Sequence, residues 1–81
     1  MNTTQMRDWM YESLGQLKTL RDEIRVDLHL AGMDAKDKWK ELEPKFHEAE
    51  KLVENISEVS RHAMEDAVSR IRAFRESLRK H

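Results

Sequence analysis

The chain has 81 residues, of which 38% are charged and 38% are hydrophobic, with a formal net charge of −1 at pH 7. A chain of this length forms one domain, near the lower size limit for a core without disulfides or metal, so residues 1–81 are expected to be a single helical domain. The sequence contains no cysteine. This excludes disulfides, cysteine-ligated zinc, iron–sulfur clusters and thiol catalysis, and it fits a reducing compartment, with the cytoplasm as the expected location.

A stripe of apolar residues runs along nearly the whole chain, mostly in steps of three, four or seven residues, which place side chains on one face of an α-helix. Because a helix with one apolar face must bury it against another helix, the stripe predicts an all-α fold rather than disorder. No apolar run is long enough to span a bilayer, and Met1–Thr4 lacks the features of a signal peptide. The stripe consists of Met10, Leu14, Leu17, Leu20, Ile24, Leu28, Ala31, Ala35, Trp39, Leu42, Phe46, Ala49, Val53, Ile56, Ala63, Ala67, Ile71, Phe74 and Leu78.

The first helix is expected to begin at Thr3 or Thr4, because either hydroxyl can cap a helix N-terminus. Three later places could turn the chain: Gly32, Pro44 and the segment 55–57. The apolar stripe keeps its helical phase across all three, which favours long, nearly continuous helices. We therefore expect two long antiparallel helices in a coiled-coil hairpin, with a single kinked rod as the alternative. The sequence leaves open which of the three places makes the turn.

A second apolar row, formed by Val26, Leu30 and Met33, lies on the helix side opposite Ile24 and Leu28. A two-helix hairpin covers only one of these sides, so the second row predicts another surface, most simply a second copy of the chain. Small residues beside the row allow that copy to come close. We expect a homodimer in which two hairpins form a four-helix bundle. Its predicted interface consists of Val26, Leu30, Met33, Ala31 and Gly32.

Charge is distributed unevenly, since residues 41–58 are rich in glutamate and residues 68–81 are rich in arginine. The basic end gives an alternative function, binding of nucleic acid phosphates. Against it, Glu76 interrupts the basic cluster, the sequence pI is about 6.4, and no aromatic side chains accompany the arginines. The residues of this alternative are Arg72, Arg75, Arg79 and Lys80.

Two glutamate–histidine–glutamate trios have the same spacing, and each places its side chains on one helical face. A turn near Asn55 would bring His47 opposite His62, and this arrangement suggests a transition-metal site as a further alternative. However, di-iron helical bundles carry a glutamate three residues before each histidine, where this chain has Pro44 and Val59. The trios are Glu43, His47 and Glu50, and Glu58, His62 and Glu65.

The sequence contains no P-loop, nucleophile elbow, GxGxxG or HExxH motif. A narrow helical hairpin also offers no obvious concavity for substrate. We therefore expect a non-enzymatic interaction or scaffold module that needs no cofactor.

One segment resembles a known group of proteins. It runs Leu28-His29-Leu30-Ala31-Gly32-Met33-Asp34-Ala35-Lys36-Asp37-Lys38-Trp39 and continues to Leu42-Glu43-Pro44. The segment covers about a fifth of the chain and resembles a stretch of short bacterial helical proteins, some of them labelled stress-related. The resemblance implies a helical hairpin and a bacterial origin, and it brings no catalytic residues.

Overall fold

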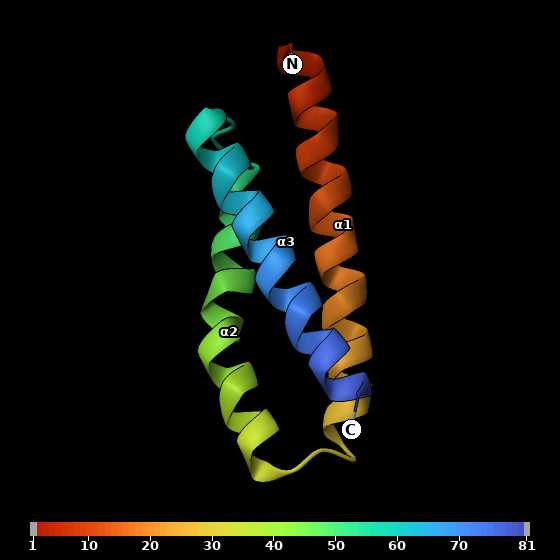
Figure 1. Cartoon of the computed structure of the whole chain (residues 1–81). Coiled ribbons are helices and arrows are strands. Elements are labelled where there is room, and N and C mark those ends of the chain that lie inside the picture. The colour runs from red at the N-terminus through yellow and green to blue at the C-terminus, as the bar shows by residue number, and fades with distance from the viewer. Residues whose placement is uncertain (1, 81) are drawn as a thin grey trace.

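Three helices make up almost all of the fold. The computed structural model describes residues 2–80 and contains α1 (Thr3–Leu28), α2 (Met33–Leu52) and α3 (Glu58–Arg79). The prediction of an all-α fold is confirmed. The chain runs along α1, returns along α2 and runs back along α3, so α1 and α3 are parallel and α2 is antiparallel to both (Figure 1). The molecule is elongated, with principal extents of 43 × 17 × 15 Å.

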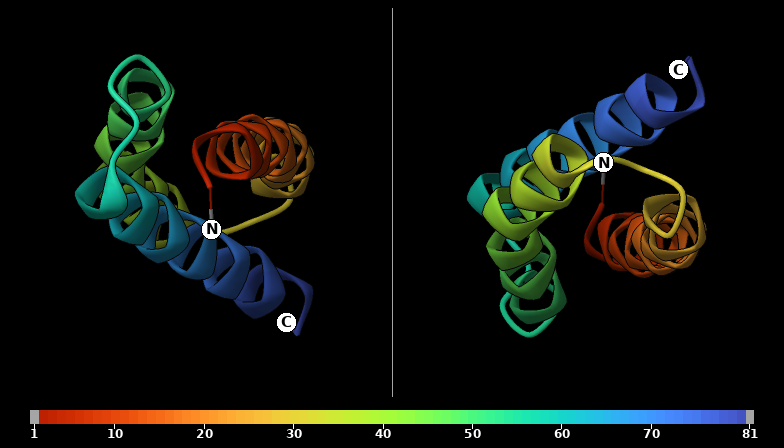
Figure 2. Two further views of the ribbon diagram at one scale, coloured as in Figure 1. Left: turned by 90° about the horizontal axis from the view of Figure 1, so that it is seen from above. Right: turned by 90° about the horizontal axis from the view of Figure 1, so that it is seen from below.

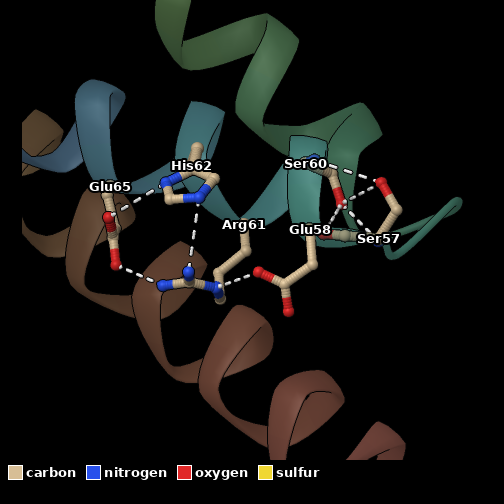
Figure 3. A network of polar contacts seen from close by, with 6 residues as sticks. All are labelled: Ser57, Glu58, Ser60, Arg61, His62 and Glu65. Carbon is tan, nitrogen blue, oxygen red and sulfur yellow. Dashed lines mark hydrogen bonds and ion pairs between the residues drawn. The ribbon is translucent and has the colours of Figure 1, made fainter. Parts of the chain in front are cut away.

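The expected hairpin of two long helices is corrected to a unit of three helices, because the chain turns both at Gly32 and at Ser57. Each of these residues has an extended backbone and serves as the N-cap of the next helix, with ψ of 175° at Gly32 and 176° at Ser57. Ser57 forms a reciprocal cap with Ser60: the Ser60 N–H donates to Ser57 Oγ at 3.2 Å, and the Ser57 N–H donates to Ser60 Oγ at 2.7 Å (Figure 3). These bonds satisfy amide groups that a helix start leaves without partners.

Pro44, the third candidate turn, lies inside α2. Proline removes the N–H that would bond to the carbonyl of Lys40. Lys40 and Pro44 are both exposed, so water can satisfy that carbonyl and the helix continues. At the N-terminus, α1 is capped by Asn2 rather than by Thr3 or Thr4. The Gln5 N–H donates to Asn2 Oδ1 at 2.8 Å.

The core forms where α3 runs obliquely across both other helices (Figure 2). α3 packs most extensively against α1, then against α2, while α1 and α2 contact each other least. The rings of Trp39 on α2 and Phe74 on α3 stack with centroids 6.1 Å apart. The buried hydrophobic residues are Met6, Met10, Leu14, Leu17, Leu20, Ile24, Trp39, Phe46, Ala49, Met64, Ala67, Ile71 and Phe74.

Most of the predicted stripe is buried or partly buried, with one exception near the start of α3. Ala63 belongs to the predicted stripe but is exposed, and the neighbouring Met64 is fully buried in its place. Among the helices of residues 2–80, none is long and apolar enough to cross a membrane.

Removing one buried methylene from α3 should destabilise the fold more than removing exposed atoms from the same helix. Ile71 is fully buried and Val59 is 79% exposed. We expect Ile71→Val to lower the free energy of unfolding by about 0.5–1.5 kcal/mol, and Val59→Ala to change it by less than about 0.5 kcal/mol. Urea unfolding followed by circular dichroism measures both, and equal effects would contradict the packing of α3.

Candidate interaction surface

Exposed apolar side chains are concentrated at the turn between α1 and α2. Val26 is 68% exposed, Leu30 is 94% exposed and Met33 is 71% exposed. Tyr11 and Val59 are the other large hydrophobic residues exposed within residues 2–80, and they lie elsewhere along the chain. Single exposed apolar residues are ordinary, whereas several in one short segment indicate a contact surface.

The local backbone explains why Leu30 points away from the core. The last turn of α1 tightens, so that the Leu30 N–H donates to the Asp27 carbonyl at 3.1 Å and the Ala31 N–H donates to the Leu28 carbonyl at 3.2 Å. The chain then becomes extended at Gly32 and enters α2. Leu30 thus lies at the apex of a hydrogen-bonded connection.

A groove of about 540 Å³ lies beside this apex, between the α1–α2 turn, the beginning of α2 and the last turns of α3. Its apolar lining comes from Leu30, Ala31, Ala35, Phe74 and Leu78. Of the five predicted interface residues, the structure brings Leu30, Ala31 and Gly32 together along the groove. Val26 and Met33 are exposed nearby but do not line it.

The groove lining also includes charged residues of both signs. Asp27 and Asp34 are acidic, and Lys38 and Arg79 are basic. The sequence pattern did not predict this groove, because its wall depends on where the end of α3 lies.

The arginines predicted to bind nucleic acid make contacts with α1. Arg72 Nη2 donates to Gln16 Oε1 at 3.1 Å, and Arg79 Nη2 donates to Glu23 Oε2 at 2.7 Å. Arg75 Nε also lies 2.7 Å from Glu23 Oε2, but it is buried without a hydrogen bond. The N–H of Arg75 is therefore poorly aimed, and we treat this contact as an ion pair rather than a hydrogen bond. Together these contacts attach the C-terminal half of α3 to α1.

The same ionic cluster reaches Asp27, whose Oδ2 lies 3.8 Å from Arg79 Nε. That oxygen is buried and accepts no hydrogen bond. Lys80, the last residue of the predicted basic cluster, is exposed. The side chains of three of the four predicted phosphate ligands are thus already engaged with α1.

The two glutamate–histidine trios form local contacts along their own helices. His47 Nδ1 lies 3.2 Å from Glu50 Oε1, and His62 Nδ1 lies 3.7 Å from Glu65 Oε2. Arg61 occupies the carboxylates of the second trio, at 3.1 Å from Glu58 and 2.7 Å from Glu65 (Figure 3). The chain does turn between α2, which carries the first trio, and α3, which carries the second. Over residues 2–80, however, no group of three or more histidine or acidic side chains is arranged to hold a metal ion.

Asp66 on α3 forms a separate ionic contact with α2. Arg70 Nε donates to Asp66 Oδ1 at 3.0 Å, and Lys45 Nζ lies 3.6 Å from Asp66 Oδ2. The hydrogen bond from Arg70, with the nearby positive charges of Arg70 and Lys45, holds the pKa of Asp66 below its ordinary value of 3.8.

The chain matches no known protein-family model, no curated protein and no solved structure. The resemblance of residues 28–44 to short bacterial helical proteins therefore stays a prediction. The evidence about function therefore comes from the surface of this chain.

The contact of Glu23 with Arg75 and Arg79 should stabilise the fold, because the Glu23 and Arg75 side chains are only 32% and 20% exposed. We expect Glu23→Gln to lower the free energy of unfolding by about 1 kcal/mol, between the effects typical of surface and buried ion pairs. Glu76→Gln is the matched control, because Glu76 also contacts Arg75, at 3.7 Å, but is 56% exposed. Its effect should stay below about 0.5 kcal/mol. A larger loss for Glu76→Gln than for Glu23→Gln in urea unfolding would contradict the assignment.

The lowered pKa of Asp66 predicts a small pH dependence of stability. A carboxyl group whose pKa is depressed by folding stabilises the fold above its unfolded pKa, and this stabilisation is lost as the pH falls through its folded pKa. Titration of the Asp66 carboxyl carbon by NMR should give a midpoint below 3.8. Arg70→Gln should raise this midpoint, because it removes the largest cause of the shift. An unchanged midpoint in that variant would show that Arg70 does not interact with the carboxylate.

Proposed function

We propose that this chain is a non-enzymatic helical interaction module of the cytoplasm that associates with a second copy of itself. The observation that carries the proposal is the concentration of Val26, Leu30 and Met33, all mostly exposed, at one turn. Most of the longer apolar stripe is buried or partly buried within the chain, and of the stripe only the part that lines the groove, Ala31, Ala35, Phe74 and Leu78, is proposed to meet a partner. These three residues, Val26, Leu30 and Met33, which we call the turn surface, are exposed apolar side chains close together in the sequence, and burying them gives a driving force for association.

The form of the proposed dimer follows from the fold. Each copy contributes a unit of three helices, so we propose a pair of such units in place of a four-helix bundle made from two hairpins. Closed two-fold dimers are the commonest assemblies of identical chains, and they use the same patch on both copies. The turn surface supplies such a patch at one end of each molecule.

The contacts of the C-terminal arginines favour this proposal over nucleic acid binding. Arg72, Arg75 and Arg79 bond or pair with Gln16 and Glu23 on α1. Binding of a phosphate would have to compete with these partners. A structural role explains the same residues without a ligand.

The proposal predicts a dimer that depends on Leu30. Sedimentation equilibrium over a range of concentrations should show dimerisation of the unaltered chain. Leu30→Glu should weaken it at least about tenfold, because it removes the apolar side chain that the interface buries and puts in its place a carboxylate that loses water on burial. Leu30 is 94% exposed, so the helical circular dichroism signal should be kept.

Val59→Glu is the matched control, since Val59 is 79% exposed but lies outside the turn. It should leave dimerisation unchanged. A chain that remains monomeric at every concentration, with a melting temperature independent of concentration, would rule out self-association.

A further inference from the structure

We propose that two copies of the chain exchange Leu30, with the Leu30 side chain of each copy inserted into the groove of the other. The inference rests on the proposed self-association and specifies its geometry. It assigns the occupant of the groove formed by the α1–α2 turn and the end of α3.

Leu30 is the inserting residue. Leu30 is 94% exposed, the highest value among the large hydrophobic residues that the structure describes as exposed. The hydrogen bonds from Leu30 and Ala31 to the end of α1 hold the backbone on either side of it. The side chain therefore projects from a defined position, which limits the conformational entropy lost on binding.

The groove is large enough to receive a leucine side chain. Its volume is about 540 Å³, within the range of about 300–1,000 Å³ that accommodates whole small molecules, so a leucine side chain fits. Phe74 and Leu78 supply apolar lining from α3, and Ala31 and Ala35 supply small apolar side chains from the α1–α2 turn and the start of α2. Gly32 has open space where a Cβ atom would lie.

Two-fold symmetry would let both insertions form at once. Leu30 is itself at the edge of the groove, so the inserting side chain and the receiving groove are neighbours on one surface. A two-fold axis that passes between them places each Leu30 opposite the groove of the other copy, and both contacts form together.

The charges around the groove favour a second copy as the occupant. Asp27 and Arg79 pair within the chain, at 3.8 Å between Oδ2 and Nε, and the remaining Asp34 and Lys38 carry one charge of each sign. A surface with both signs can pair with its own rotated copy without net repulsion, whereas a strongly acidic or basic partner would meet like charges. The groove lining therefore has no net charge that would repel a second copy.

Cysteine cross-linking tests this geometry directly, because the chain has no cysteine of its own. Leu30→Cys and Ala35→Cys would be made as separate single variants, one carrying a size tag, then mixed and oxidised. Reciprocal insertion predicts that the disulfide between position 30 of one copy and position 35 of the other exceeds either disulfide between identical variants. Val59→Cys mixed with Ala35→Cys is the control and should give little cross-linked product.

A second variant tests the groove without cross-linking. Ala35→Phe fills the groove from its own wall and should weaken dimerisation at least tenfold in sedimentation equilibrium, with the circular dichroism spectrum unchanged. If the chain dimerises but the 30–35 disulfide does not exceed the Val59 control and Ala35→Phe still dimerises normally, reciprocal insertion is wrong and self-association stands. If the unaltered chain is monomeric throughout, both proposals are wrong, and the groove is left to a partner of different sequence.

Discussion

The constraint on which the structure depends is that each helix has one apolar face, and all three faces have to be buried against one another within 81 residues. α3 meets this constraint because it crosses both other helices and contacts each of them more than they contact one another. Its fully buried residues Met64 and Ile71 belong to a core that two helices alone would leave open on one side. The ionic cluster between α1 and α3 then orients the end of α3, and that end forms one wall of the groove. The interaction surface is therefore a consequence of how the core is closed.

The all-helical character of the fold could be predicted from the sequence because the apolar period is a local property. The number of helices could not. Phase continuity across a break usually indicates one continuous helix, but here the chain keeps its phase through two short connections, residues 29–32 and 53–57. Gly32 and the segment 55–57 were recognisable as places where the chain could turn, but so was Pro44, which lies inside α2. Within α3 the difference is one position: Met64 is buried in place of Ala63, while Ala67, Ile71 and Phe74 are buried as the stripe predicts.

The exposed row at the turn could be recognised from spacing alone, since Val26 and Leu30 are one helical turn apart and face away from the stripe. The groove could not, because it requires Phe74 and Leu78 at the end of α3 to lie beside residues of the α1–α2 turn and the start of α2, far away in the sequence. The role of the C-terminal arginines did leave a signal. Glu23 and Asp27 have the same spacing of four as Arg75 and Arg79, which is the pattern expected of two parallel helices with complementary charged edges. Both long-range hydrogen bonds between α1 and α3 also join residues 56 apart, as parallel packing requires.

The most direct test of the account is a series of two-dimensional amide NMR spectra recorded from micromolar to millimolar protein. If folding covers the apolar stripe within one chain and leaves the turn surface for association, the concentration-dependent shifts will be confined to residues 26–38 and 74–79. The amides in the middle of α1, α2 and α3 will keep their positions. Spectra that do not change with concentration, or changes spread along the buried stripe, would contradict the account.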